Sequence, residues 1–263
     1  MGLFLVLLMS SWHVGMKKVP TSQSTYRDVK NNPSNVLENF MGNVIKVKAS
    51  DGFTFDAYKA VPTGPVRGAI VVLQEIFGVN AHIRRVTESF AEIGYIAVAP
   101  ALFDRVRRAT ELTYSDSDFD AAMALWKTTS QEDALKDVAA SIDAVSEESQ
   151  GKVGVVGYCW GGALSFIASG NLPGIKATVS YYGNVPAHLD VKPKVPLMMH
   201  FSEHDKHVSI DAVPAIRELY PQAQVYTYDA DHGFNTLPRK TYQKESADLA
   251  LERTLGFLSV HVG

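Results

Sequence analysis

The sequence of 263 residues contains a single cysteine, Cys159. One cysteine excludes an intramolecular disulfide and a zinc site built from several thiolates. Cys159 is therefore either a small core residue or a reactive thiol. The chain also lacks an excess of either charge, since 25 Lys and Arg stand against 28 Asp and Glu, a net charge of −3. This balance gives no electrostatic reason to expect a nucleic acid or an anionic membrane as a partner.

Long apolar runs are scarce as well. Residues 2–9 (GLFLVLLM) match the apolar core of a signal peptide in length but are too short to span a bilayer. They lack a basic start and a clear cleavage site, so we interpret residues 1–15 as an over-extended start before Met16 or as a disordered leader. A degenerate export signal is the alternative. We expect a cytoplasmic protein with no membrane span, in which residues 1–36 form an irregular segment.

The rest of the chain, residues 37–263, reads as one α/β domain. Two alternating runs on either side of Asp51-Gly52 predict a β-hairpin. Apolar or β-rich runs then alternate with segments of helical spacing, which predicts a mostly parallel sheet flanked by helices, with antiparallel strands at its start. The predicted later strands are residues 69–73, 95–100, 152–156, 176–183, 195–201 and 224–229, and the predicted helical segments are residues 81–94, 117–149, 161–170, 209–220 and 242–260. In such sheets ligands bind at the carboxyl ends of the strands.

The strongest chemical signal is the segment Gly157-Tyr158-Cys159-Trp160-Gly161, which follows a predicted strand and opens a predicted helix. It has the G-x-S-x-G pattern of a nucleophile elbow, with cysteine in place of serine. The positive end of the following helix favours a thiolate. The alternative is a tight or phosphate-binding turn beside a buried cysteine. No G-x-G-x-x-G is present here, and the order of strand and helix favours the elbow.

A nucleophilic thiol needs a base and usually an orienting acid. Asp205 follows the strand at residues 195–201 and His232 follows the strand at residues 224–229, in the order nucleophile, acid, histidine that hydrolases of this topology use. We therefore predict Asp205 as the acid and His232 as the base. Asp231 is a weaker candidate because it is adjacent to the histidine in the chain.

Other polar residues near these strand ends allow two interpretations each. His204 and His207 flank Asp205, but without a nearby cysteine they are more typical of solvated loop residues than of metal ligands, and we expect no metal or cofactor. Glu75 follows the strand at residues 69–73, where this topology places an oxyanion-hole amide. Composition alone makes Glu75 equally a loop charge and a catalytic residue.

Four segments together carry a resemblance. QEIFGVN (residues 74–80), GYCWGG (157–162), HDKHV (204–208) and DHGF (231–234), in this order, resemble the dienelactone hydrolase family from about residue 42 to the C-terminus. The resemblance implies a compact α/β-hydrolase domain without a large cap. The activity it implies opens the enol-lactone of 4-carboxymethylenebut-2-en-4-olide to maleylacetate, although the family also contains esterases and lactonases.

The resemblance further implies residue roles. Cys159 would attack the carbonyl, with His232 and Asp205 completing the triad, and the backbone N–H groups of Trp160 and Ile76 would form the oxyanion hole. Glu75 would contact the resting thiol and take its proton when substrate binds. We thus expect a carboxymethylenebutenolidase-like hydrolase of a small lactone or activated ester, monomeric, whose partners are that substrate and water.

A carboxylated substrate needs a cation, and two arginines are candidates. Arg105 follows the strand at residues 95–100, where the family places one substrate-binding arginine. The family's second arginine lies shortly after the histidine, but position 236 is Thr here and Arg239 comes seven residues after His232. Arg239 either binds substrate or is solvated near the last helix.

This departure from the family pattern keeps alternative functions open. They are a general carboxylesterase or thioesterase that uses the same residues, and a non-hydrolytic binding protein on the same scaffold. A redox-sensing thiol is disfavoured because a resolving cysteine is lacking.

Overall fold

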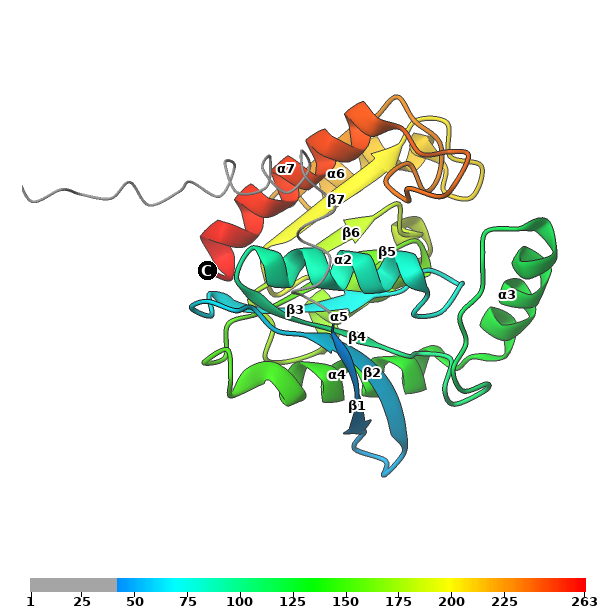
Figure 1. Cartoon of the computed structure of the whole chain (residues 1–263). Helices are drawn as coiled ribbons and strands as arrows, with labels where there is room; N and C mark the ends of the chain where they lie inside the picture. The colour runs from blue at the N-terminus through cyan, green and yellow to red at the C-terminus, as the bar shows by residue number, and fades with distance from the viewer. Residues whose placement is uncertain (1–41) are drawn as a thin grey trace, which may run out of the picture. The chain divides into compact units, whose positions relative to one another are not determined.

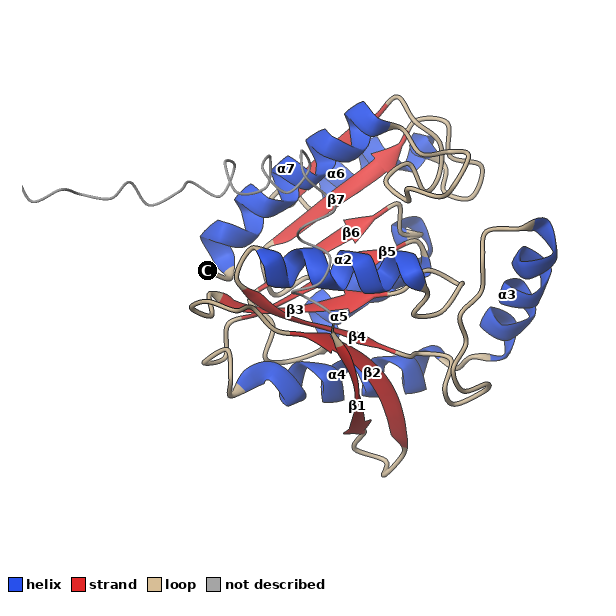
Figure 2. Cartoon of the chain, viewed as in Figure 1, coloured by secondary structure: helices blue, strands red, loops and turns tan. Residues whose placement is uncertain are grey.

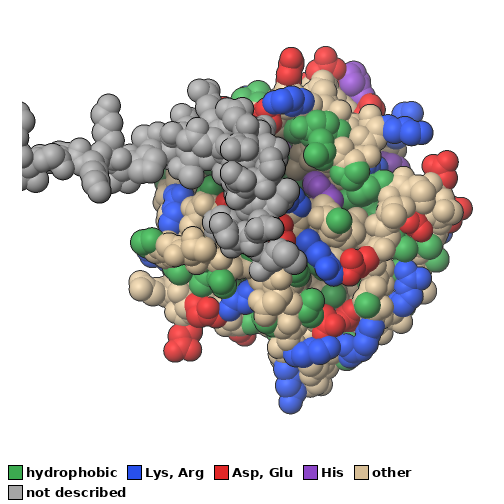
Figure 3. Space-filling model, in the orientation of Figure 1, with side chains coloured by type: hydrophobic (Ala, Val, Ile, Leu, Met, Phe, Trp, Pro, Cys, Tyr) green, Lys and Arg blue, Asp and Glu red, His purple; other side chains and the backbone are tan. Residues whose placement is uncertain are grey.

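The computed structural model describes residues 42–263. The expected irregular segment at residues 1–36, with the interpretation of residues 1–15, lies outside the described residues. Within the described part, no helix is both long and apolar enough to cross a bilayer. On the part of the surface visible in Figure 3, acidic and basic side chains lie next to one another.

The described chain forms an eight-stranded sheet and its covering helices (Figure 1). The strands are β1 Asn43–Lys48, β2 Thr54–Ala60, β3 Gly68–Leu73, β4 Tyr95–Pro100, β5 Val153–Tyr158, β6 Ala177–Tyr181, β7 Leu197–Ser202 and β8 Gln224–Tyr228. The helices are α2 Ala81–Glu92, α3 Asp116–Thr128, α4 Gln131–Ser146, α5 Trp160–Asn171, α6 Val213–Leu219 and α7 Lys244–His261, with 3₁₀ turns η1 Val185–His188 and η2 Ile210–Ala212.

The strand order β1-β2-β4-β3-β5-β6-β7-β8 confirms the predicted α/β architecture. β2 runs antiparallel to β1 and to β4, and the remaining pairs are parallel (Figure 2). The order reverses around β3, which lies between β4 and β5. The carboxyl ends of β3 and β5 therefore face the crevice where ligands bind in open α/β sheets.

Alternating side chains of the central strands supply two separate cores. Ile70 and Val72 pack with α2 and α7 on one face of the sheet. Val71 and Leu73, on the opposite face, pack with α4 and α5. Because both faces of β3 are covered, its residues are apolar on both sides, and its sequence therefore shows no alternation of apolar and polar residues.

Helix α3 is the exception to this layering. It lies apart from the sheet, on the side of its carboxyl edge (Figure 1). Its buried residues Ala122 and Leu125 pack in a small cluster with Phe77 and Phe103, which lie on the loops after β3 and β4. The predicted helical stretch at residues 117–149 is thus two helices. Ser130 separates them, and its hydroxyl accepts the backbone N–H of Asp133, which starts α4.

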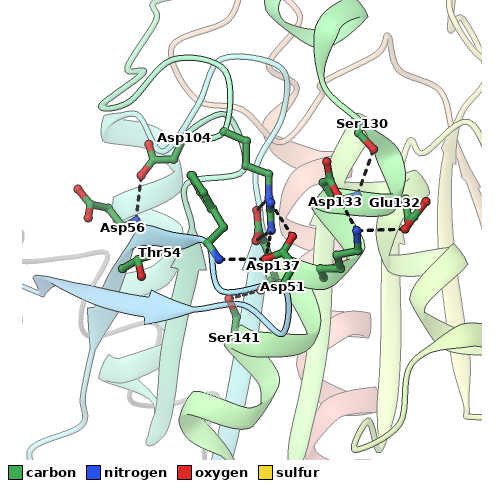
Figure 4. Close-up of polar contacts among 12 residues, drawn as sticks. Asp51, Thr54, Asp56, Asp104, Ser130, Glu132, Asp133, Asp137 and Ser141 are labelled. Carbon is green, nitrogen blue, oxygen red and sulfur yellow. Dashed lines mark hydrogen bonds and ion pairs between the residues drawn. The ribbon is translucent and has the colours of Figure 1, made fainter.

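Arg105, on the loop after β4, connects the hairpin turn to α4. Its guanidinium donates two hydrogen bonds to Asp137 of α4, at 2.9 and 2.8 Å, and two to Asp51 of the β1–β2 turn, at 2.8 and 3.2 Å. Figure 4 shows Asp51 and Asp137 meeting between the turn and the helix. The Asp137 side chain is fully buried, and burial raises its pKa while Arg105 opposes that rise.

We expect Arg105→Ala to lower the free energy of unfolding by about 3 kcal/mol, because it leaves the buried Asp137 carboxylate without its cation. Urea denaturation measures the change. Lys136→Ala is the matched control, since Lys136 forms exposed pairs with Glu132 and Asp133 that contribute less than about 1 kcal/mol. A loss in Arg105→Ala no larger than that of the control would contradict this assignment.

Candidate active site

Cys159 occupies the turn between β5 and α5 in a strained conformation. Its φ of 54° and ψ of −114° lie outside the regions that non-glycine residues favour. Its N–H donates to the Tyr181 carbonyl at 3.0 Å, which fixes the turn to the neighbouring strand β6. Such a conformation costs on the order of 1–3 kcal/mol and persists only where the surrounding structure imposes it. The predicted strand–turn–helix context of the elbow is present.

Two glycines allow the close backbone contacts of this turn. A Cβ atom on Gly157 would lie 1.9 Å from the carbonyl oxygen of Gly161. A Cβ on Gly161 would lie 2.4 Å from the carbonyl oxygen of Leu73, and the Gly161 N–H donates to the Gln74 carbonyl at 3.1 Å. The elbow is thereby packed directly against the end of β3, so the loop carrying Glu75 and Ile76 lies beside Cys159.

His232 and Asp205 form a buried hydrogen-bonded pair. The His232 Nδ1 lies 2.7 Å from the Asp205 Oδ2, and both side chains are almost fully buried. The other carboxylate oxygen accepts the backbone N–H groups of His207 and Val208, at 2.8 and 3.0 Å. Burial alone raises the pKa of Asp205, but these hydrogen bonds hold it below its usual value. Asp205 therefore remains a carboxylate that orients the imidazole.

The protonation of His232 depends on Cys159. Burial alone lowers the pKa of His232, but the charge of the Cys159 sulfur and hydrogen bonding with Asp205 and Cys159 raise it to about 10. The Asp205 carboxylate and the Cys159 sulfur thus lie on either side of the imidazole, and both favour its protonated form.

Glu75 is completely buried and paired. Its Oε1 accepts a hydrogen bond from the Arg239 guanidinium at 3.1 Å, and its Oε2 accepts one from the Tyr114 hydroxyl at 2.8 Å. The rings of Phe77 and Tyr114 lie within 6 Å of the Arg239 guanidinium carbon. Arg239 is thus largely buried and paired, and of the two interpretations of this residue the solvated one is wrong.

The candidate site opens into a cleft of about 750 Å³. Its lining includes five of the eight residues predicted for the site, namely Cys159, His232, Trp160, Ile76 and Arg239. Asp205 and Glu75 lie directly behind it, through their contacts with His232 and Arg239. Residues from distant parts of the chain are therefore brought to one cavity.

Arg105 is not brought to this cleft, and the expectation that it binds substrate needs correction. Its position after β4 does place it beyond the carboxyl end of that strand. Its side chain is instead held by Asp51 and Asp137, because these two carboxylates satisfy the guanidinium on both edges. His204 pairs with Asp229 at an exposed position, and the described residues contain no cluster of three or more His, Cys, Asp or Glu able to hold a metal ion.

Three residues near the site were not identified as such from the sequence. Tyr114 binds Glu75, Tyr182 packs its ring 4.8 Å from that of His232, and His207 lies in the cleft with its ring 4.9 Å from that of His232. Tyr114 and Tyr182 stand in no motif, so no sequence signal could have found them. The proximity of His207 to the predicted acid was the available signal for the third.

Comparisons with known proteins identify the family of the chain. The model of the Dienelactone hydrolase family matches residues 55–262. The carboxymethylenebutenolidase of Pseudomonas putida is 35% identical over 225 residues, which cover 82% of this chain and 95% of that protein. Carboxymethylenebutenolidase 1 of Cupriavidus pinatubonensis is 28% identical over 226 residues, which cover 82% and 96%.

A solved structure described as a "Putative Dienelactone Hydrolase" from Klebsiella pneumoniae superposes with a TM-score of 0.73. It is 25% identical and covers 84% of this chain and 99% of its own. The family match spans most of the chain, and the architecture is that of the α/β-hydrolases. The chain therefore belongs to the dienelactone hydrolase family, as its four sequence segments predicted.

Proposed function

We propose that this hydrolase cleaves a small lactone or an activated ester through a thiol acyl-enzyme. The observation that carries the proposal is the convergence of the Cys159 elbow and the Asp205–His232 pair on one cleft. In the first step the Cys159 sulfur attacks the substrate carbonyl carbon and His232 protonates the departing alkoxide. In the second step His232 takes a proton from water, whose oxygen attacks the thioester, and the acid and the free thiol are released.

Backbone N–H groups at the cleft supply the oxyanion hole in this proposal. Trp160 is the first residue of α5, where the helix provides no acceptor for its N–H. Ile76 lies on the loop packed against the elbow, and both residues line the cleft. Each donor aimed at the developing oxyanion is worth roughly 3 kcal/mol of transition-state stabilisation.

Glu75 and Arg239 define how a carboxylated substrate would be received. The family resemblance implies that the glutamate contacts the resting thiol, whereas the described geometry holds Glu75 on Arg239 and Tyr114. A substrate carboxylate would therefore have to compete with Glu75 for Arg239. Displacement would release Glu75 towards the thiol, and the substrate would thereby activate the nucleophile.

A general carboxylesterase or thioesterase on the same residues is the second candidate. It is favoured by the apolar side chains that line the cleft, among them Phe77, Phe119, Met123 and Leu164. Comparing turnover of the dienelactone with that of p-nitrophenyl acetate separates the two candidates, since the first requires the lactone to be far the better substrate.

Replacing the nucleophile is the first test. We expect Cys159→Ala to reduce kcat by at least about 10³-fold on both the dienelactone and p-nitrophenyl acetate, because no acyl-enzyme can form. The wild-type protein should give a burst of p-nitrophenol equal to one thiol per chain, and iodoacetamide should abolish it. Unchanged hydrolysis by Cys159→Ala would remove this site from the reaction.

The pH profile is the second test. With a pKa of about 10, His232 carries its proton below pH 10 and loses it above, so kcat/KM should fall as the pH rises through about 10 and not near 6.5. Asp205→Asn removes a charge and a hydrogen-bond acceptor that favour the imidazolium, so it should move this alkaline limb to lower pH. An alkaline limb near pH 7 in the wild type, or one that Asp205→Asn leaves in place, would contradict the raised pKa of His232.

A further inference from the structure

One wall of the cleft is lined by apolar side chains that the reaction itself does not require. Phe119, Met123 and Trp126 of α3 line the cleft, as does Ala163 of α5. Cavities of 300–1,000 Å³ hold drug-sized ligands, and this cleft measures about 750 Å³. A single small lactone ring leaves much of that volume and most of the apolar wall unused.

Cations that could hold an anionic group are scarce in the cleft. Arg239 is already paired with Glu75, and the other basic lining residue, Lys127, is exposed at the end of α3. Burial lowers the pKa of His188 and of His207, so both rings are neutral near pH 7. Among the described lining residues, the charge of the largely buried Arg239 is therefore already balanced by Glu75 before any substrate binds.

The direction of the acyl group follows from the position of His232. The leaving group has to lie beside His232, which protonates it and which the loop after β8 carries. Figure 1 shows α3 standing apart from the loops that follow β7 and β8. The acyl part of a bound ester, on the other side of the carbonyl, then extends along α3.

We propose that α3 is an acyl-binding wall and that the substrate class is neutral esters with an extended apolar acyl group. This inference rests on the proposed function of Cys159 as the nucleophile. Met123 and Trp126 are its specificity-determining residues, since they offer apolar surface to the cleft without contacting the reacting atoms. Apolar surface removed from water on this wall supplies the binding free energy.

The experiment measures kcat/KM for p-nitrophenyl acetate, butanoate and hexanoate, which share one leaving group. Each fully buried methylene is worth at most about a fourfold gain, so four additional methylenes should raise kcat/KM at least tenfold from acetate to hexanoate. The mono-p-nitrophenyl ester of adipic acid has the same chain length as hexanoate but ends in a carboxylate. We expect it to be at least tenfold poorer than hexanoate.

Variants of α3 test whether this helix determines the preference for longer acyl groups. Met123→Gln keeps the side-chain length but adds an amide, and we expect the hexanoate-to-acetate ratio to fall about fivefold. Trp126→Gln, at an exposed position whose replacement leaves the core intact, should also lower the ratio. Leu249→Gln is the matched control, because Leu249 is an exposed apolar residue of α7 away from the cleft, and its ratio should equal that of the wild type.

The outcomes separate this inference from the proposed function. Hydrolysis can depend on Cys159 while kcat/KM stays flat or falls with acyl chain length, or while the adipate ester is the better substrate. Either result overturns the acyl-binding wall alone. Hydrolysis that persists in Cys159→Ala overturns the proposed function. A chain-length preference that neither α3 variant alters overturns the assignment of the wall to this helix.

Discussion

Close backbone packing between the β5–α5 turn and the end of β3 is the constraint on which the rest of the site depends. Gly157 and Gly161 leave no room for a Cβ atom, and the Gly161 N–H is bound to the Gln74 carbonyl. This packing imposes the unusual backbone angles of Cys159 and sets the loop that carries Glu75 beside it. A larger residue at either glycine would separate Cys159 from the loop that carries Glu75 and Ile76.

Pairing of buried charges then decides what each ionisable group can do. Asp205 faces His232, Glu75 faces Arg239, and each member of these pairs would be costly to bury alone. In the first pair the carboxylate occupies only Nδ1, so the other edge of the imidazole is left to face Cys159. In the second pair Arg239 donates to one Glu75 oxygen through Nη1, and the Tyr114 hydroxyl donates to the other.

Sequence reasoning predicted the order of strands and helices, but it could not predict the direction of individual side chains. Apolar runs predicted the buried strands, and the strand ends placed Cys159, Asp205 and His232 at one edge. Arg105 also follows a strand, but its partners Asp137 and Asp51 lie 32 and 54 residues away along the chain. Only the folded chain brings these carboxylates close enough to compete for it, and no spacing in the sequence records that.

Helix α3 shows a further limit of the same reasoning. The sequence predicted helical stretches over residues 117–149, and an amphipathic helix ordinarily buries its apolar stripe against the core. In α3 only Ala122 and Leu125 are buried, in a small cluster, while Phe119 and Met123 line the cleft. Part of its apolar surface therefore faces the cleft rather than the core, and a ligand that covered it would gain roughly 25 cal/mol per Å² removed from water. Because α3 packs on the loops after β3 and β4 and not on the sheet, its apolar residues could differ without changing the core.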